Sequence, residues 1–197
     1  MIHFFEKGGS DITLLLLHGT GGDEHQIVPL ARQMAPDANL LSFRGEVSEH
    51  GNLRFFARFE DGSFDWEDLR ARVAELAAEI DAAVEKYQID RSKMVAVGYS
   101  NGANTAAALW YLYPESVRHA IFLRPMAMMD EKPDLSGHSG LVLVGATDNV
   151  CSPREGLAMA DSFLALGATV ETVAIPAAHN LIRQDAEEAS NFIDRLR

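Results

Sequence analysis

A serine stands between two glycines in residues 98–102 (Gly-Tyr-Ser-Asn-Gly), which match the pattern Gly-x-Ser-x-Gly. In this pattern a sharp turn between a strand and a helix exposes the serine hydroxyl, and the glycines let the bent backbone pass close to neighbouring chain. The flanking sequence fits, because the apolar residues 94–97 predict a buried strand and small residues follow the turn. Ser100 is therefore the candidate nucleophile.

A serine hydroxyl needs a base to accept its proton, and the base needs an acceptor that fixes its tautomer. Behind a turn of this kind the acid and the histidine follow the serine in sequence. His179 is the one histidine that comes after both Ser100 and Asp148, an acid just past the end of an apolar strand. We expect Asp148 to orient His179 and His179 to activate Ser100. The alternatives are that Asp148 only caps a loop and that His179 is an exposed loop residue.

A glycine-rich loop, residues 18–22 (His-Gly-Thr-Gly-Gly), follows the first long aliphatic run. Acyl transfer requires two N–H groups directed at the oxygen on which negative charge develops. We expect Asn101, next to the nucleophile, to supply one of them and Thr20 in this loop to supply the other. His18 is expected to brace the loop rather than to act as a base. Phosphate binding is disfavoured, since neither Gly-x-Gly-x-x-Gly nor the P-loop Gly-Lys-Ser/Thr pattern occurs.

Short aliphatic runs alternate with amphipathic segments along the chain. The aliphatic runs predict strands at residues 12–17, 40–43, 94–97, 120–123, 141–144 and 169–175. Helices are expected over residues 23–34 and 64–87, in the alanine-rich segment that ends before Pro114, and over 153–166 and 181–196. Residues 44–63 are expected to form a long loop. This alternation predicts an α/β fold with a mostly parallel central sheet and helices on both faces.

The length of 197 residues suits one domain with a sizeable core, so we expect a single domain over residues 1–197. About seventeen residues separate the strands expected at 120–123 and 141–144. That is too few for a large helical cap domain. The site is therefore expected to be open.

The composition, 47% hydrophobic and 23% charged, excludes a disordered, collagen-like or membrane-spanning chain. A net charge of −12 disfavours nucleic acid and anionic membranes as partners. The single cysteine, Cys151, excludes an internal disulfide, and no basic segment leads into a long apolar run at the N-terminus. We expect a cytoplasmic protein whose partner is a small-molecule ester, and the chain could also form a homodimer.

Several segments together resemble a known family. They are residues 17–24, 44–45, 54–58, 98–103 and the segments that carry Asp148 and His179. They are similar to the phospholipase/carboxylesterase family of α/β hydrolases, and more narrowly to bacterial carboxylesterases of the MhqD and YahD type. The resemblance implies the α/β-hydrolase fold and hydrolysis of carboxylic esters without a cofactor or metal. It also implies the same triad and the Thr20/Asn101 pair.

The substrate is less well defined by the sequence. Arg54 and Arg58 could favour a substrate carboxylate or could pair with nearby glutamates, and Phe56 lies between them as a further candidate contact. Three methionines could line an acyl pocket or fill the core: Met126, Met128 and Met129. Esters with small or short-chain acyl groups, cleaved through an acyl-enzyme, are the first expectation.

Other activities, and more than one role for the cysteine, are also compatible with the sequence. The activity could be that of a thioesterase or lysophospholipase. The same fold could instead serve as a small-molecule receptor that retains the triad. Cys151, which lies close to Asp148 in sequence, could be a buried inert thiol or could have a redox or electrophile-trapping role.

Overall fold

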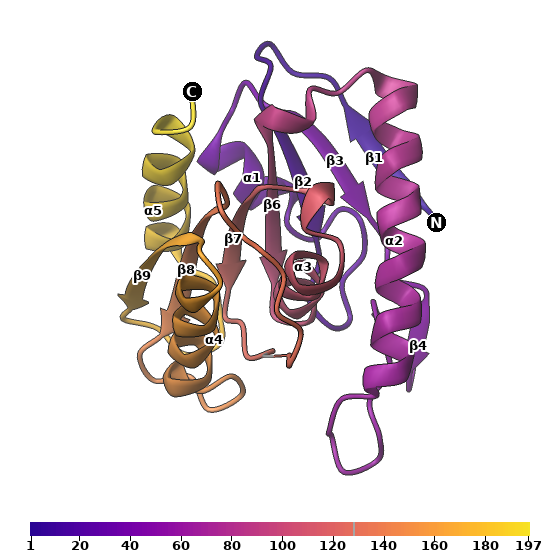
Figure 1. Ribbon diagram of the computed structural model, residues 1–197, viewed down its shortest axis with the longest axis vertical. Helices are drawn as coiled ribbons and strands as arrows, with labels where there is room; N and C mark the ends of the chain where they lie inside the picture. The colour runs from indigo at the N-terminus through magenta and orange to yellow at the C-terminus, as the bar shows by residue number, and fades with distance from the viewer. Residues whose placement is uncertain (128) are drawn as a thin grey trace.

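A seven-stranded sheet runs through the centre of the protein, whose structure is a computed structural model that describes residues 1–127 and 129–197. Its strands are β1 (His3–Glu6), β2 (Thr13–Leu17), β3 (Asn39–Phe43), β6 (Met94–Tyr99), β7 (His119–Leu123), β8 (Ser139–Gly145) and β9 (Thr169–Ile175). Their order is β1-β3-β2-β6-β7-β8-β9 (Figure 1). Strand β1 is antiparallel to β3, and every other pair is parallel.

The parallel strands bring distant chemical groups to one edge of the sheet. Leu17 pairs with Gly98, Tyr99 with Leu123, and Gly145 with Ile175. Each pair lies at or near the carboxyl ends of two neighbouring strands, so the segments that follow these strands share an edge. In open α/β sheets ligands bind at this edge.

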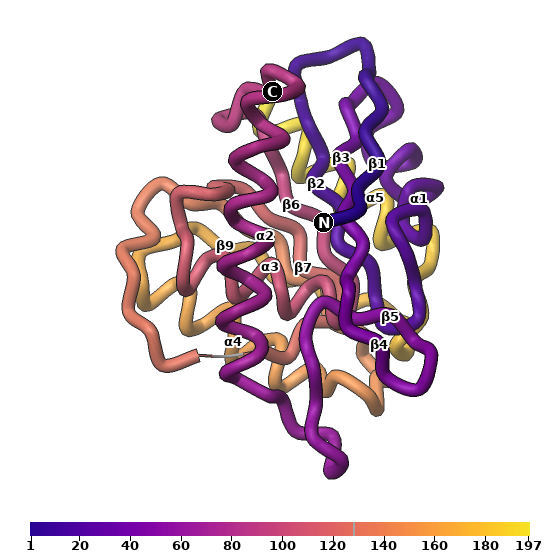
Figure 2. Tube along the Cα trace, turned by 90° about the vertical axis from the view of Figure 1, so that its right-hand side faces the viewer, coloured from indigo at the N-terminus to yellow at the C-terminus, as the bar shows by residue number. Residues whose placement is uncertain are grey.

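Helices cover both faces of the sheet because its central strands are aliphatic on both faces. Figure 2 shows α1 (Val28–Met34) and α5 (Arg183–Asp194) together on one face, where they pack on each other. The other face carries α2 (Trp66–Tyr87), α3 (Asn101–Leu112) and α4 (Pro153–Ala165). On this face the rings of Trp110 from α3, Phe163 from α4 and Phe122 from β7 pack edge-on or tilted, with centroids 4.9–5.4 Å apart. Two hydrophobic cores therefore hold the sheet.

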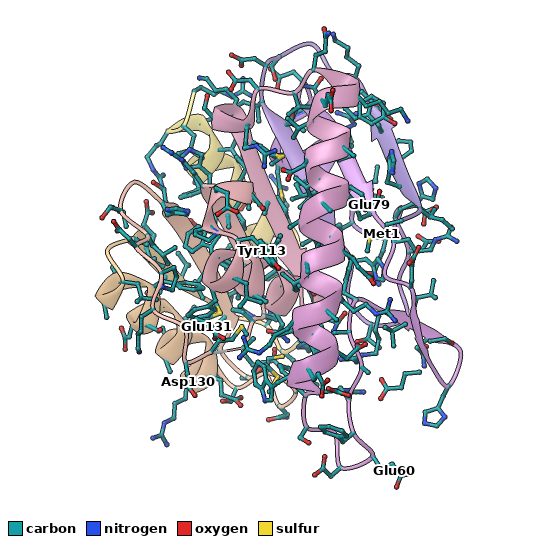
Figure 3. All side chains as sticks on the ribbon, turned by 45° about the vertical axis from the view of Figure 1, so that its right-hand side comes forward. Met1, Glu60, Glu79, Tyr113, Asp130 and Glu131 are labelled. Carbon is teal, nitrogen blue, oxygen red and sulfur yellow. The ribbon has the colours of Figure 1, made fainter. Side chains whose placement is uncertain are left out.

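The long helix α2 illustrates how the sequence forms these elements. Its large apolar residues recur every three or four positions. The six buried residues of the helix all pack in the core: Leu69, Val73, Leu76, Ala77, Ile80 and Ala83. Asp65 caps the first turn by accepting hydrogen bonds from two backbone N–H groups. Glu79 of α2 also accepts a hydrogen bond of 2.8 Å from the ammonium group of Met1, which ties β1 to the helix (Figure 3).

The six strands and five helices expected from the sequence are confirmed, as are the mostly parallel sheet and its two-sided helical cover. Three details differ. Helix α1 begins at Val28 and not at residue 23, and residues 24–27 before it form turns. The expected loop 44–63 contains a hairpin of β4 (Val47–Glu49) and β5 (Asn52–Arg54), and β1 was not expected.

No large cap covers the sheet edge, because the described residues between β7 and β8, 124–127 and 129–138, contain no helix. Met128, a candidate pocket residue, lies outside the described residues. None of the helices formed by the described residues combines the length and apolar character that a bilayer span requires.

Candidate active site

Ser100 stands alone between the end of β6 and the start of α3. Its backbone angles are φ 52° and ψ −110°, and its N–H donates to Leu123 O at 2.8 Å. Such angles are strained for any residue but glycine and occur most often at functional sites. The flanking glycines are required for space, because a Cβ at Gly98 would overlap the carbonyl of Gly102, and a Cβ at Gly102 would overlap that of Leu17. The turn therefore holds the hydroxyl at the carboxyl edge of the sheet.

A chain of hydrogen bonds joins the three residues that the sequence singled out. Ser100 Oγ lies 2.9 Å from His179 Nε2, and His179 Nδ1 lies 2.8 Å from Asp148 Oδ2. With the ring proton on Nδ1, the serine hydroxyl donates to Nε2 and the histidine donates to the carboxylate. The structure thus brings Ser100, His179 and Asp148 together in the order that nucleophilic activation requires.

Asp148 is held as a carboxylate. Its second oxygen, Oδ1, accepts hydrogen bonds from the N–H groups of Val150 (2.8 Å) and Cys151 (3.0 Å). Burial acts to raise the pKa of Asp148, but the bonds from His179, Cys151 and Val150 outweigh it, so the pKa lies below its usual range. The group that faces His179 is therefore charged over the physiological range of pH.

Two backbone N–H groups stand beside Ser100 without an acceptor in the described part of the chain. In the glycine-rich loop, the N–H groups of Gly19, Gly21 and Gly22 all donate to protein oxygens, whereas that of Thr20 does not. The N–H of Asn101 is the first of α3, a position that has no partner within a helix. Thr20 and Asn101 both line the cavity that contains Ser100.

His18 braces the glycine-rich loop, as its position suggested. Its side chain is fully buried; Nδ1 donates to Gly19 O at 2.7 Å, and Nε2 accepts the N–H of Gly45 at 2.9 Å. Burial lowers the pKa of His18, although the bond to Gly19 opposes that effect. Beside it, Arg44 and Glu24 form a bidentate pair whose Nη2–Oε1 distance is 2.6 Å. These contacts fix the loop from two sides.

Arg124 and Asp185 form a buried clamp on the loop that carries His179, and this clamp was not among the features predicted from the sequence. Arg124 donates from Nε to Ala178 O and from Nη2 to Asn180 O, both at 3.0 Å, and it binds both oxygens of Asp185 at 2.8 and 3.0 Å. Tyr99 donates its hydroxyl to His179 O at 3.0 Å. Three consecutive carbonyls, those of residues 178–180, are therefore held from the protein interior.

A cavity of about 250 Å³ opens over Ser100. It is lined by Thr20, Arg54, Arg58, Phe64, Tyr99, Ser100, Asn101, Asn104, Met126, Val150, Cys151 and His179. Of the residues expected to contact substrate, Arg54, Arg58 and Met126 lie in its wall. Phe56 does not. Its ring is fully buried, with its centroid 5.0 Å from that of Phe64, because it packs in the same hydrophobic core as the buried residues of α2.

Met129 and Cys151 are also buried. Met129 is 6% exposed and belongs to the core on the face of the sheet that carries α2, α3 and α4, so it fills the core rather than the cavity. Cys151 reaches the cavity wall but is only 4% exposed, and burial raises the pKa of its thiol to about 12. Among the described residues no group of three or more His, Cys, Asp or Glu side chains is arranged to hold a metal ion.

The sheet order, the strained serine turn after a central strand, and the later aspartate and histidine define the class of α/β hydrolases. No protein-family model matches the chain. The curated protein "Putative hydrolase MhqD" of Bacillus subtilis (strain 168) is 42% identical over 194 residues, which cover 98% of this chain and 97% of MhqD.

Solved structures agree with this relationship. The carboxylesterase of Bacillus cereus is 38% identical with a TM-score of 0.93, over 99% of this chain and 94% of that one. A structure of YahD with malic acid is 28% identical with a TM-score of 0.91, over 100% of this chain and 99% of that one. The chain belongs to this family of α/β-hydrolase carboxylesterases, and it is a hydrolase of the esterase type.

Proposed function

We propose that the protein cleaves carboxylic esters with small or short-chain acyl groups through a covalent acyl-enzyme on Ser100. The observation that carries the proposal is the continuous hydrogen-bond chain from Asp148 through His179 to Ser100, which ends in an open cavity of about 250 Å³. A serine with such a base attacks carbonyl carbon at neutral pH.

Acylation proceeds in two steps. Ser100 Oγ attacks the ester carbonyl carbon while its proton moves to His179 Nε2, and the carbonyl π electrons move to oxygen. Thr20 N–H and Asn101 N–H donate to that oxygen. The bond from carbon to the alkoxy oxygen then breaks, the carbonyl reforms, and the proton on Nε2 passes to the leaving alcohol. Asp148 remains a carboxylate and stabilises the imidazolium between the two steps.

Deacylation reverses the roles with water in place of the alcohol. His179 takes a proton from water, whose oxygen adds to the acyl carbon, and the same two amides hold the oxyanion. The bond to Ser100 Oγ breaks, and the proton returns from His179 to the serine. The products are the free acid, the alcohol and the starting enzyme.

The size of the cavity supports a small substrate. A volume of about 250 Å³ lies below the usual range of ligand pockets. Its apolar wall is formed by Phe64, Met126 and Val150. The related YahD was solved with malic acid, a small carboxylic acid, and we propose that acids of comparable size leave this cavity as products.

A fluorophosphonate probe and a series of nitrophenyl esters, from acetate to dodecanoate, test the proposal. We expect stoichiometric labelling, turnover that is greatest for the shorter esters, and loss of both in Ser100→Ala. Ser92→Ala, which removes an exposed hydroxyl at the opposite end of β6, is the matched control and should behave as the wild type. A protein that neither labels nor turns over any ester would favour a receptor, and a preference for long chains or thioesters would contradict the substrate class.

A further inference from the structure

We propose that the substrate is an ester that also carries a carboxylate, and that Arg58, supported by Arg54, binds this second group. The inference rests on the proposed function, because the two arginines line the cavity that contains Ser100. It adds a charged substituent to the small ester described above.

The charge of the cavity wall differs from that of the protein as a whole. The chain has 29 acidic and 17 basic side chains, with a net charge of −12. Of the twelve described residues that line the cavity, two are arginines and none is acidic. A cavity with cations at its wall in an acidic protein would attract an anion locally, although the distant charges repel it.

Arg54 is fixed in the wall. It is 3% exposed, donates from Nε to Phe56 O at 3.2 Å, and donates from Nη1 to Thr20 Oγ1 at 2.7 Å. Burial lowers the pKa of Arg54, and the nearby charge of Arg58 lowers it further. A guanidinium in this environment stays charged, and a further anion that comes close to it would stabilise that charge.

One carboxylate serves both arginines. Glu49 Oε2 lies 3.3 Å from Arg54 Nη1 and 2.9 Å from Arg58 Nη2. These bonds hold the pKa of Glu49 below its usual range, with the bond from Arg58 as the main cause. Two cations and one anion leave a net charge of +1 at the wall. A second carboxylate would neutralise it.

Arg58 is the arginine that can reach a ligand. Its side chain is 35% exposed, and the loop that carries it continues to Glu60 at its tip (Figure 3). Among the described residues Glu49 alone accepts a hydrogen bond from it. A guanidinium has five N–H donors in a planar fork that matches a carboxylate. Donors of Arg58 therefore remain for substrate.

Arg54 links this subsite to the reacting carbonyl. Its bond to Thr20 Oγ1 fixes the residue whose N–H we assign to the oxyanion. Because Ser100 and Arg58 line the same cavity of about 250 Å³, one small molecule can present its ester to the serine and its carboxylate to the arginine. Arg54 is thus a positioning residue, and Arg58 is the residue that selects the anion.

Paired esters that differ only in charge test the proposal, with acid release followed by titration at constant pH. Monomethyl succinate carries the carboxylate on the acyl side and is compared with methyl succinamate. Acetoxyacetate carries it on the alcohol side and is compared with acetoxyacetamide. We expect kcat/KM for the charged member of at least one pair to be higher by about tenfold, and this preference should shrink at high salt. Equal values in both pairs would overturn the proposal.

Variants assign the preference to the arginines. Arg58→Gln should reduce the ratio of charged to neutral kcat/KM to near one, Arg58→Lys should retain part of it, and Glu49→Gln should increase it by removing the competing carboxylate. Arg195→Gln removes the same charge from an exposed pair with Glu171 and should leave the ratio unchanged. An unchanged ratio in Arg58→Gln would also overturn the proposal.

A binding measurement separates this subsite from the proposed function. Succinate and succinamide are titrated into Ser100→Ala and into Ser100→Ala/Arg58→Gln, and binding is followed by NMR. Tighter binding of succinate that disappears with Arg58 supports the subsite even if no ester is turned over, in which case the proposed function alone fails. No difference between succinate and succinamide would contradict the subsite, whatever the turnover.

Discussion

The two sides of the cavity are built in different ways. On the histidine side, which we define as Arg124, Asp148, residues 178–180 and Asp185, the groups that hold the loop are almost entirely buried and bonded to one another. The arginine side is defined as residues 18–20, Arg54 and Arg58. Here His18 and Arg54 are buried, whereas the side chain of Arg58 is 35% exposed.

The difference separates two tasks. Proton transfer between Ser100 and His179 depends on geometry within a fraction of an ångström, and buried, fully bonded groups provide that accuracy. Choice of substrate depends on charge and size at the cavity mouth, where exposed groups can adapt. We therefore expect substitutions on the histidine side to change kcat and those at Arg58 to change selectivity.

The largest effect is expected from Asp148→Asn. Unlike the carboxylate, the amide can donate its N–H to Nδ1 of His179, which favours the tautomer with the ring proton on Nε2. That tautomer cannot accept the proton of Ser100, so kcat should fall by about 10⁴-fold. Steady-state kinetics on a nitrophenyl ester measure it. Asp161→Asn, an exposed position on α4, makes the same chemical change and should have wild-type activity. A modest fall in Asp148→Asn would mean that another group orients His179.

The second largest effect is expected when the clamp of Arg124 and Asp185 is removed. The double variant Arg124→Met/Asp185→Asn removes both charges, so neither is left buried without its partner. The carbonyls of residues 178 and 180 lose their hydrogen-bond donor, which should loosen the position of His179. We therefore expect kcat to fall by about 10²-fold with little change in KM. In the single variant Arg124→Met the free energy of unfolding should also fall by about 3–5 kcal/mol, because Asp185 is left as an unpaired buried charge. Kinetics and denaturant titrations separate the two effects. Full kcat in the double variant would remove the clamp from catalysis.

The pH dependence of the unfolding free energy tests the burial of His18 on the arginine side. The folded protein keeps His18 neutral, since its pKa is lowered by burial, whereas the unfolded chain binds a proton at this residue below about pH 6.5. The contribution of His18 is therefore complete above that pH and is lost as the pH falls. Denaturant titrations between pH 5 and pH 8 should show a smaller loss of unfolding free energy on acidification in His18→Gln than in the wild type. Parallel curves would contradict this account.

The smallest effect concerns Cys151, which lines the cavity and donates its N–H to Asp148. With its thiol pKa raised to about 12 by burial, almost none of it is thiolate at neutral pH. Iodoacetamide should leave the native protein unlabelled at pH 7.5 and should label it after denaturation, as mass spectrometry can show. Rapid labelling of the native protein, with loss of esterase activity, would restore a reactive role for this cysteine.

Much of the fold could be predicted because its signals are local. Continuous aliphatic runs predict buried parallel strands, and the positions of Ser100, Asp148 and His179 after such strands place them at one edge. Strand β1 was missed because it is short and only partly buried, and β4 and β5 have three residues each. Phe56 was predicted to contact substrate because it lies two residues from each of Arg54 and Arg58, which line the cavity, whereas its own ring is buried in the core.

The clamp could not be predicted for a different reason. Arg124 and Asp185 are 61 residues apart, and each looks ordinary where it stands: a basic residue after a strand, and an acid in the first turn of a helix. Their pairing depends on the backbone of Arg124, which has φ 56°, and on where α5 docks. Neither is visible without the assembled structure.

Asp185 has a second partner, since its Oδ2 also accepts the N–H of Ile182 at 2.7 Å and so caps the start of α5. Asp185, in the first turn of α5, thus both caps this helix and binds Arg124, and through Arg124 it secures the loop of His179. One carboxylate therefore couples the docking of α5 to the position of His179, so that any displacement of this helix should be transmitted to the distance between His179 and Ser100.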